Sequence, residues 1–279
     1  MKPAIFAGFL MKKRDGTLRT PDECIRLCKE AGYTTIDWSP NYSRISWQDE
    51  AKAAARAAEK YGVTIIQSHT PYNFYKKDPL DFFKMQLGQS VETAAMLGVK
   101  DLVFHFDEYH PAPDAPFDPE KAIDIIYDVM APYIEKTASL GINAALETII
   151  EDRQVRSHFG GDFRELEASL SRFNDEHVTC CWDFGHAELA YKEHHIENMK
   201  KIGKRISCTH VHDNYYERDL HLLPCSGNLN WEALIPALRS TGYDGALTFE
   251  GGYGCIPDVV VPEFMKYTYD TMDFLCGIK

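Results

Sequence analysis

The stretch PEKAIDIIYDVMAPYIEKTASLGINAALE, residues 119–147, contains the unit from which the fold can be predicted. Up to residue 140 its apolar side chains recur at spacings of three and four, which is the pattern of an amphipathic helix. Gly141 follows, as glycine often does just past the end of a helix. The apolar run 143–147 comes next and ends on an acidic residue, Glu147. A helix that leads directly into a short buried strand is typical of β/α proteins.

The same alternation runs through the whole chain. Short β-type runs occur at residues 4–9, 34–38, 63–69, 101–106, 143–147, 178–183, 206–212 and 246–250. Helical segments lie between and after them, at residues 21–32, 47–62, 79–98, 119–141, 162–173, 196–202, 230–242 and 262–275. Alternating strands and helices predict a parallel sheet, and eight such units predict a closed barrel. We therefore expect an α/β protein, a single (β/α)8 TIM barrel that forms one domain over residues 1–279.

An open, doubly wound sheet is the alternative to the barrel. That fold often carries a G-x-G-x-x-G turn after its first strand, and no such turn follows the run 4–9. The chain has 279 residues, which suits a single barrel of about 250 residues with short additions. No long linker or low-complexity segment interrupts the alternation, so the barrel is the favoured prediction.

Composition narrows the class of protein. Hydrophobic residues make up 44% and charged residues 26%, which is ordinary for a soluble globular chain. The net charge of −12 argues against a protein that tracks DNA, because DNA binding usually needs a basic surface. Eight cysteines without a C-x-x-C pair indicate reduced thiols in a cytoplasmic protein. We expect neither a secretory signal nor a membrane span, which needs about 20 apolar residues.

Polar side chains stand at the ends of six successive β-type runs. In a TIM barrel the active site lies at the C-terminal ends of the strands. Those ends carry His69, His105, Glu147, Asp183, His210 and Glu250. Imidazole nitrogens and carboxylate oxygens together are a ligand set for a divalent metal such as Mn²⁺, Mg²⁺, Co²⁺ or Zn²⁺. We therefore expect a metal site at this face of the barrel.

Each of these residues also has a structural interpretation. A single histidine at a strand end, such as His69 or His105, is more often a hydrogen-bonded structural residue than a ligand. Glu147 and Glu250 differ, because each ends an apolar run where an unpaired carboxylate would be costly. Asp183 is in the same position. For these carboxylates a role as ligand or as acid/base catalyst is favoured.

The stretch THVHDNYYERDLHLLPCSGNLNW, residues 209–231, continues the seventh run into a loop above the barrel. Side chains alternate along an extended segment, so His210 and His212 should point the same way. His210 is nearest the strand end and is the expected ligand. His212 and Asp213 are expected to contact the ligands and orient them without binding the metal themselves. Three further residues are expected to form a second metal cluster or to bind substrate hydroxyls: His186, Asp219 and His221.

Other residues near the mouth are candidates for substrate binding. Arg218 is the only arginine or lysine between His210 and His221, so it could orient a substrate oxygen, or it could belong to a solvated loop. Trp38 and Tyr72 could stack on a sugar ring. Further aromatic candidates are Tyr42, Phe106, Tyr109, Tyr215, Tyr216 and Tyr253. The segment EGGYG, residues 250–254, could cradle a phosphate or could be a plain glycine turn.

Together these motifs resemble the xylose isomerase-like TIM-barrel superfamily. That superfamily includes sugar and sugar-phosphate isomerases and epimerases, inosose dehydratases, hydroxypyruvate isomerases and metal-dependent apurinic/apyrimidinic endonucleases. The segments that carry the resemblance are SHTPY (68–72), LVFH (102–105), ALE (145–147), WDFGHA (182–187), THVHDN (209–214), DLHLLPCSGNLNW (219–231) and TFE (248–250). The resemblance covers essentially the whole chain.

The resemblance to the epimerase-type members implies one metal, bound by Glu147, Asp183, His210 and Glu250. In those enzymes the two glutamates also act as acid and base on opposite faces of the sugar carbon. His186 matches their contact to a substrate oxygen. The arginine that they use after the histidine ligand has no clear counterpart here, because Tyr216 lies near its usual position and Arg218 is two residues further on.

The endonuclease branch uses more ligands, and this chain resembles it in having a counterpart for each. Those counterparts are His69, His105, Glu147, Asp183, His186, His210, Asp219, His221 and Glu250. The chain also departs from that branch, which begins with a G-A-H-V-S-like strand where this sequence has FAGFL. The H-D-S-Y motif of that branch appears here as HTPY (69–72), and an aromatic segment, DWSPNYSRISW, stands where a basic DNA-inserting loop is expected.

The favoured hypothesis is a divalent-metal-dependent sugar or sugar-phosphate isomerase or epimerase. It would act by proton transfer through a metal-stabilised enediolate on a small carbohydrate, free or phosphorylated. Two alternatives remain open at this point. One is a multi-zinc apurinic/apyrimidinic endonuclease-type phosphodiesterase, although the acidic charge makes a nucleic-acid partner the less favoured one. The other is a metal-binding barrel subunit that acts only with a partner chain; a homo-oligomer is also compatible with the sequence.

Overall fold

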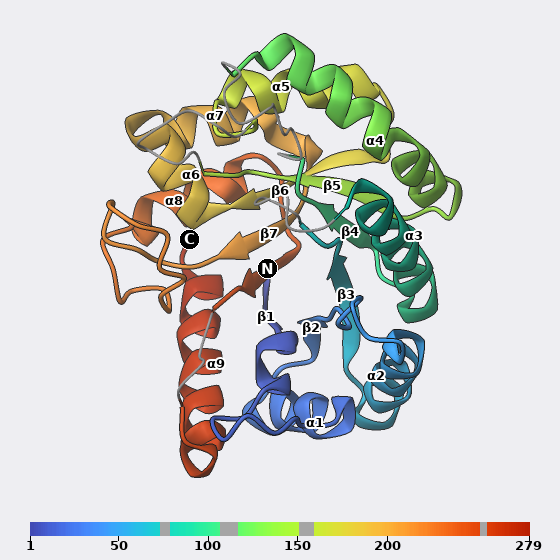
Figure 1. Cartoon of the computed structure of the whole chain (residues 1–279). Helices are drawn as coiled ribbons and strands as arrows, with labels where there is room; N and C mark the ends of the chain where they lie inside the picture. The colour runs from blue at the N-terminus through green and yellow to red at the C-terminus, as the bar shows by residue number, and fades with distance from the viewer. Residues whose placement is uncertain (73–78, 107–116, 151–158, 252–255) are drawn as a thin grey trace.

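The β-type runs form one closed parallel barrel in the computed structural model of the chain (Figure 1). The structure describes residues 1–72, 79–106, 117–150, 159–251 and 256–279. Its strands are β1 (Lys2–Phe6), β2 (Thr35–Asp37), β3 (Thr64–His69), β4 (Asp101–Phe104), β5 (Asn143–Glu147), β6 (Val178–Asp183), β7 (Ile206–Val211) and β8 (Ala246–Phe249). Each strand pairs with the next in chain order, and β8 pairs with β1. The predicted (β/α)8 TIM barrel is confirmed.

Helices follow the strands and form the outer layer of the barrel (Figure 1). They are α1 (Pro21–Ala31), α2 (Trp47–Tyr61), α3 (Leu80–Leu97), α4 (Pro119–Ser139), α5 (Phe163–Phe173), α6 (Phe184–Tyr191), α7 (His195–Ile202), α8 (Trp231–Ser240) and α9 (Val261–Gly277). Short 3₁₀ turns are η1 (Ala7–Met11), η2 (Lys192–His194), η3 (Gly203–Arg205) and η4 (Asp258–Val260). In the described ranges no helix combines the length and apolar character needed to cross a bilayer.

Helix α1 shows how local sequence sets the element boundaries. Thr20 precedes the helix, and its hydroxyl accepts a hydrogen bond from the backbone N–H of Glu23 at 3.2 Å. The Glu23 carboxylate accepts one in return from the N–H of Thr20 at 2.7 Å, which completes a capping box. Gly32 ends the helix with a φ of 119°, a conformation that a residue with a side chain rarely adopts.

Two segments differ from the sequence prediction. The first strand ends at Phe6, and residues 7–11 form η1 instead of continuing the strand to residue 9. A Cβ on Gly8 would lie 2.6 Å from the Phe6 ring, so glycine permits a close turn here. Helix α6 was not predicted at all. It follows β6 without a loop, and most of its side chains are buried, so it lacks the polar face that marks an amphipathic helix.

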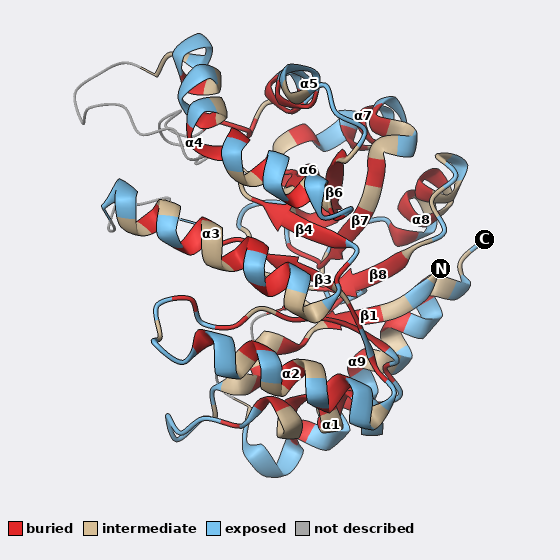
Figure 2. Ribbon diagram, turned by 90° about the vertical axis from the view of Figure 1, so that its right-hand side faces the viewer, coloured by how far each residue is buried: buried red, intermediate tan, exposed pale blue. Residues whose placement is uncertain are grey.

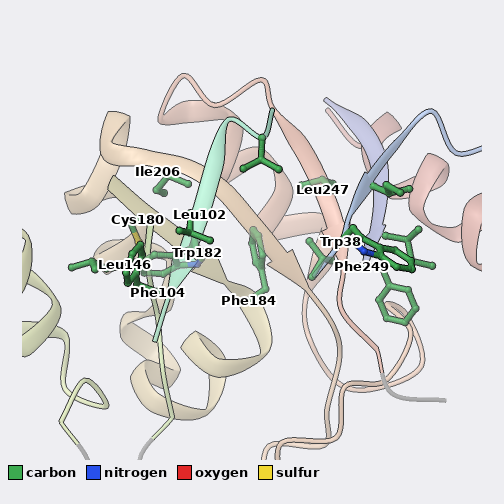
Figure 3. Close-up of a cluster of buried hydrophobic side chains, with 14 of the residues drawn as sticks. Trp38, Leu102, Phe104, Leu146, Cys180, Trp182, Phe184, Ile206, Leu247 and Phe249 are labelled. Carbon is green, nitrogen blue, oxygen red and sulfur yellow. The ribbon is translucent and has the colours of Figure 1, made fainter. Parts of the chain in front are cut away.

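The main hydrophobic core lies between the strands and the surrounding helices. Figure 2 shows buried residues concentrated on the strands and on the helix faces turned toward them. The close-up in Figure 3 shows alternate strand residues, such as Phe104, Leu146 and Trp182, among these side chains. Each is completely buried. Burial of a large apolar side chain contributes about 1.5–3 kcal/mol, so this layer supports the barrel from outside.

A second, smaller cluster of buried residues consists of Val103, Ala145, Cys181 and Cys208, from four neighbouring strands. Side chains two positions apart on a strand share a face. The polar residues two positions further along are His105, Glu147, Asp183 and His210. The alternation of the strands therefore carries these residues on the same face as the small cluster, at the end where active sites lie.

Candidate metal centre

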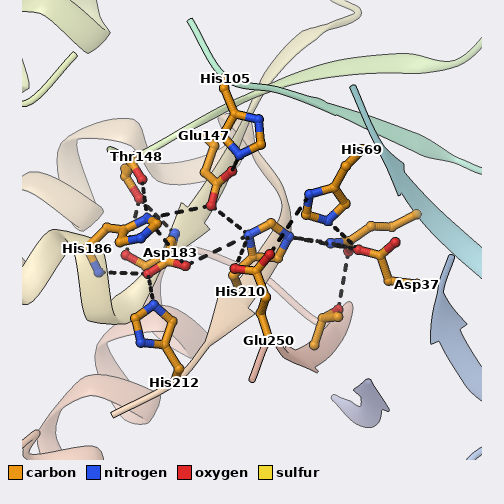
Figure 4. A network of polar contacts seen from close by, with 12 residues as sticks. Asp37, His69, His105, Glu147, Thr148, Asp183, His186, His210, His212 and Glu250 are labelled. Carbon is orange, nitrogen blue, oxygen red and sulfur yellow. Dashed lines mark hydrogen bonds and ion pairs between the residues drawn. The ribbon is translucent and has the colours of Figure 1, made fainter. Parts of the chain in front are cut away.

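Four of the predicted ligands converge at the ends of β5, β6, β7 and β8 (Figure 4). One donor atom from each of Glu147, Asp183, His210 and Glu250 lies within 4.8 Å of the other three. His210 Nδ1 lies 2.8 Å from Glu147 Oε1, 3.6 Å from Glu250 Oε2 and 3.8 Å from Asp183 Oδ2. The imidazole of His210 therefore faces three carboxylates at once.

Asp183 is held in place by hydrogen bonds with His186 and Thr148. Its Oδ1 atom accepts a hydrogen bond from the backbone N–H of His186 at 2.7 Å, so Asp183 also caps α6. The hydroxyl of Thr148 accepts from the Asp183 N–H at 2.8 Å and donates to the Asp183 carbonyl at 3.1 Å. Asp183 Oδ2 is buried and accepts no hydrogen bond from any described residue. A buried carboxylate oxygen in that state is suited to a cation.

A second donor group lies beside the first one. It consists of His186, His212, Asp219 and His221, again with donor atoms within 4.8 Å of one another. His221 Nε2 lies 3.0 Å from Asp219 Oδ2, and His186 Nε2 lies 3.4 Å from the same oxygen. The rings of His212 and His221 are stacked, with centroids 4.0 Å apart. His212 joins this group directly, whereas the sequence analysis assigned it a supporting role.

A third donor group shares Glu147 with the first. It consists of His69, His105 and Glu147, and His105 Nε2 lies 2.9 Å from Glu147 Oε2. A fourth donor group consists of Asp37, His69 and His210, and Asp37 Oδ2 lies 2.5 Å from His69 Nε2. The sequence analysis did not single out Asp37, although it ends β2 and is completely buried. A search for polar residues at strand ends would have found Asp37 if it had included the second strand.

The loop between β7 and α8 is anchored by Asp213. Its carboxylate accepts hydrogen bonds from the backbone N–H of Asn214 at 2.9 Å and of Leu229 at 3.1 Å, and from Trp231 Nε1 at 3.0 Å. Asp213 also forms an antiparallel bridge with Leu222. These contacts hold the loop that carries Asp219 and His221, and none of them is with His210, which the sequence analysis expected Asp213 to support.

Gly185 leaves the space that the His212 ring occupies. A Cβ added to Gly185 would lie 1.9 Å from Cε1 of His212. With glycine at this position His212 Nε2 reaches to 3.0 Å from Asp183 Oδ1. Asp183 is therefore in contact with residues of both the first and the second donor group.

Burial and charge set the protonation of the central groups. Burial raises the pKa of Glu147, but His210 and His105 outweigh that effect and hold it well below the usual value. Burial lowers the pKa of His210, but the carboxylates of Glu250 and Glu147 raise it well above the usual value. Without a metal, these shifts favour an ionised Glu147 and a proton on His210 Nδ1, which faces it at 2.8 Å. A cation that binds here must therefore displace a proton.

The predicted substrate-binding residues fall into different environments. Tyr72 is more than half exposed, and its ring stands edge-on to His105 with the centroids 5.3 Å apart. Arg218 is exposed in the β7–α8 loop. Trp38 is completely buried in the main core, so it presents no ring face to a substrate and its prediction as a sugar-stacking residue is wrong.

The remaining aromatic candidates divide in the same way. Tyr42 and Phe106 are buried, whereas Tyr215 and Tyr216 are exposed on the β7–α8 loop. The other two, Tyr109 and Tyr253, lie outside the described residues. The glycine-containing segment considered as a phosphate cradle falls largely at 252–254, which is also outside them. The structure therefore leaves the phosphate prediction as it stood.

The sequence model of one protein family, described as the xylose isomerase-like TIM barrel, matches residues 25–270. The chain belongs to this family. The match includes all four residues of the first donor group and all four of the second. The resemblance drawn from the motifs is confirmed.

Individual proteins that are similar to this chain share less than a third of its residues. The protein y4fM from Sinorhizobium fredii is 27% identical over 268 residues, which cover 82% of this chain and 81% of that protein. The crystal structure of a D-tagatose 3-epimerase-like protein aligns with a TM-score of 0.74 at 20% identity, over 98% of this chain and 99% of the other. An AP endonuclease, family 2, from Brucella melitensis aligns with a TM-score of 0.71 at 18% identity, over 96% and 98%. At these identities the two structures show a shared fold.

Proposed function

We propose that this xylose isomerase-like barrel is a divalent-metal-dependent sugar or sugar-phosphate isomerase or epimerase. The observation that carries the proposal is the first donor group, in which Glu147, Asp183, His210 and Glu250 meet with donor atoms within 4.8 Å. Its mixture of carboxylate oxygens and one imidazole fits a divalent cation such as Mn²⁺, Co²⁺, Mg²⁺ or Zn²⁺. The buried Asp183 Oδ2, which accepts no hydrogen bond from any described residue, supports the same conclusion.

Two glutamates in this group are suited to proton transfer. A divalent cation at this site would polarise a substrate carbonyl and make the neighbouring C–H group more acidic. The pKa of Glu147 is held well below its usual value, and that of Glu250 is also lowered, since burial is outweighed by His210. Both are therefore ionised and able to act as bases. One glutamate removes the carbon-bound proton, and the other, having picked up a proton, delivers one to the substrate.

Residues around this pair would orient the sugar. His186 lies 3.6 Å from Glu147 Oε1 and 3.5 Å from Asp183 Oδ2 through its Nδ1 atom, so it is placed to contact a substrate hydroxyl beside the reacting carbon. Tyr72 is exposed beside His105 and offers a ring edge or face to the substrate. Arg218 lies on an exposed loop and would act only if that loop approaches the ligand.

Solvent isotope exchange tests the proposal. The metal-loaded protein would be incubated in deuterium oxide with a panel of ketoses, aldoses and their phosphates. We expect deuterium to enter the carbon next to the carbonyl of at least one sugar. Glu147→Gln and Glu250→Gln should each abolish net conversion, whereas Glu263→Gln, an exposed change on α9, should leave it intact. No exchange into any sugar, or full activity in both glutamate variants, would contradict the proposal.

A second function is favoured by one specific observation, the presence of four neighbouring donor groups among the described residues. The first and third share Glu147, and the second meets the first around Asp183. Such an arrangement suits two or three zinc ions and phosphodiester hydrolysis of the endonuclease type. Incision of duplex DNA at an abasic site would support this function. A chain that binds metal but acts on neither class of substrate would point to a barrel subunit that needs a partner.

A further inference from the structure

We propose that Asp37 is a positioning residue that fixes the tautomer of His69 and, through Gln67, holds the ring of His210 with Nδ1 toward the candidate metal centre. Figure 4 shows Asp37 on the far side of His210 from Asp183. The proposal rests on the metal centre described above, and it assigns a role to a buried carboxylate that the acid/base mechanism does not use. Asp37 is completely buried at the end of β2.

The contact with His69 defines the state of that ring. Asp37 Oδ2 lies 2.5 Å from His69 Nε2. An ionised carboxylate can only accept a hydrogen bond, so the proton of the ring stands on Nε2. The second nitrogen, Nδ1, then faces the centre and lies 3.9 Å from Glu250 Oε1. Asp37 therefore makes Nδ1 the atom of His69 that is able to bind a metal.

Gln67 extends the same control to His210. Its amide Nε2 donates to Asp37 Oδ2 at 3.2 Å and lies 2.8 Å from His210 Nε2. Its Oε1 accepts from the Thr248 hydroxyl at 3.2 Å. With the amide held at both ends, His210 Nε2 stays against Gln67, and Nδ1 stays 2.8 Å from Glu147 Oε1. The side-chain amide of Gln67 thus links the carboxylate of Asp37 to the ring of His210.

Ring stacking couples the two histidines. The rings of His69 and His210 lie 9° from parallel, with centroids 4.7 Å apart. Neither ring can rotate far without meeting the other. Both are buried, so water does not compete freely for their nitrogens. Asp37 Oδ2 carries the contacts to both His69 and Gln67, whereas Asp37 Oδ1 accepts no hydrogen bond from any described residue.

The chemistry of metal-bound histidines explains why a carboxylate stands here. A carboxylate behind the distal nitrogen fixes the ring tautomer and raises the basicity of the ligating nitrogen. Loss of such a partner typically weakens metal binding by about 10–100-fold. A group that served the fold alone could be replaced by any side chain of the same volume without changing the tautomer. The two roles can therefore be separated by experiment.

Two substitutions of similar size separate hydrogen bonding from charge. Asp37→Asn and Asp37→Leu both remove the negative charge, but asparagine keeps an oxygen that can accept from His69 and Gln67. The first readout is the ring ¹⁵N spectrum of the metal-free protein, with the His69 signals assigned by their loss in His69→Gln. Burial lowers the pKa of His69, but Asp37 outweighs that effect and raises it, so the spectra are compared at a pH high enough for the ring to be neutral. The second is the dissociation constant for Mn²⁺ or Zn²⁺, measured by competition with a chromophoric chelator.

We expect Asp37→Asn to keep the His69 proton on Nε2 and Asp37→Leu to give a mixture of tautomers. We expect Asp37→Leu to bind the metal about 10–100-fold more weakly than Asp37→Asn. Equal affinities and an unchanged His69 tautomer in Asp37→Leu would overturn the proposal. If Asp37→Leu does not fold, Gln67→Met replaces it; that variant should alter the ring signals of His210 but not those of His69, and unchanged His210 signals would overturn the proposal.

The two readouts also separate this inference from the proposed function. If the wild-type chain binds no divalent metal, the proposed function fails, and the tautomer of His69 in the metal-free protein still decides the role of Asp37. If the metal binds and both Asp37 variants behave alike, the proposed function stands and the positioning role is wrong.

Discussion

Asp183 accepts a hydrogen bond from the backbone N–H of His186 at 2.7 Å, so the residue that starts α6 also forms part of the candidate metal centre. One oxygen of this carboxylate accepts the hydrogen bond that caps the helix, and the other accepts no hydrogen bond from any described residue. The arrangement ties the position of a ligand to the start of a helix. It also delivers the His186 side chain to the boundary between the first and second donor groups.

This double role predicts different effects for two substitutions of Asp183. Asparagine caps helices as well as aspartate does, whereas alanine removes the cap at a cost of about 1 kcal/mol, up to about 2. We expect Asp183→Asn and Asp183→Ala both to lose metal binding, and Asp183→Ala to have the lower free energy of unfolding in urea. Equal stability of the two variants would mean that the cap contributes nothing.

Gly185 predicts a steric effect on the second donor group. Gly185→Ala places a Cβ where the His212 ring now lies, and forced repacking of this kind costs about 1–3 kcal/mol. We expect a lower midpoint of thermal unfolding and a displaced His212. Gly277→Ala is the matched control, because a Cβ there meets no atom within 4 Å and the change falls at the end of α9. A Gly185→Ala protein as stable as that control would contradict the geometry.

The hydrogen bonds that Asp213 accepts should stabilise the β7–α8 loop. Asp213→Ala leaves three N–H groups, those of Asn214, Leu229 and the Trp231 ring, without their acceptor, and each buried loss costs about 1–3 kcal/mol. Asp213→Asn keeps one acceptor oxygen and should cost less. Hydrogen exchange of the loop amides and chemical denaturation measure both effects. Similar losses in the two variants would rule out anchoring by these hydrogen bonds.

The pair formed by Asp219 and His221 predicts a pH dependence in the metal-free protein. Burial lowers the pKa of His221, but Asp219 and Glu250 outweigh it and raise the pKa to about 9. A histidine with a raised pKa contributes stability that is complete below its unfolded value, about 6.5, and is lost as the pH rises through about 9. We expect the free energy of unfolding to fall between about pH 6.5 and 9, and His221→Gln to flatten that slope. A slope that His221→Gln leaves unchanged would contradict the assignment.

Metal binding should release protons for the same reason. The pKa of His210 is raised well above its usual value, because the carboxylates outweigh the effect of burial, so a proton on Nδ1, beside Glu147, is favoured in the metal-free chain. A ligating nitrogen must lose that proton. Calorimetric titration with Mn²⁺ or Zn²⁺ in buffers of different ionisation enthalpy should give different heats. Heats that do not depend on the buffer would show that no proton leaves.

Most of the fold could be predicted from the sequence, because the order of strands in a parallel barrel follows the order of the chain. The ends of six predicted strands then had to meet, which brought His69, His105 and the four residues of the first donor group together. The start of α6 could not be predicted, since a helix buried on most sides shows no polar face. The first strand was predicted to continue to residue 9, but it ends at Phe6, because the turn at Gly8 depends on contact with the Phe6 ring.

Errors at β2 have a particular cause. This strand has only three residues, Thr35–Asp37, and its pairing with β3 shifts register between Ile36 and Asp37. Alternation along such a short, shifted strand does not reveal which of Asp37 and Trp38 faces the site. The sequence analysis chose Trp38, which is buried in the core, and passed over Asp37, which contacts His69. Contacts between residues far apart in the chain, such as His212 on Gly185, also lie beyond local patterns.

Metal content of the purified chain tests the central claim most directly. The protein would be stripped with a chelator, reloaded with Mn²⁺, Co²⁺ or Zn²⁺ and analysed by plasma mass spectrometry beside Asp183→Asn. The account predicts at least one tightly held divalent ion per wild-type chain and its loss in Asp183→Asn; two or three zinc ions would shift the choice toward the multi-metal hydrolase. A wild-type chain that retains no metal, or an Asp183→Asn chain that retains as much as the wild type, would contradict it.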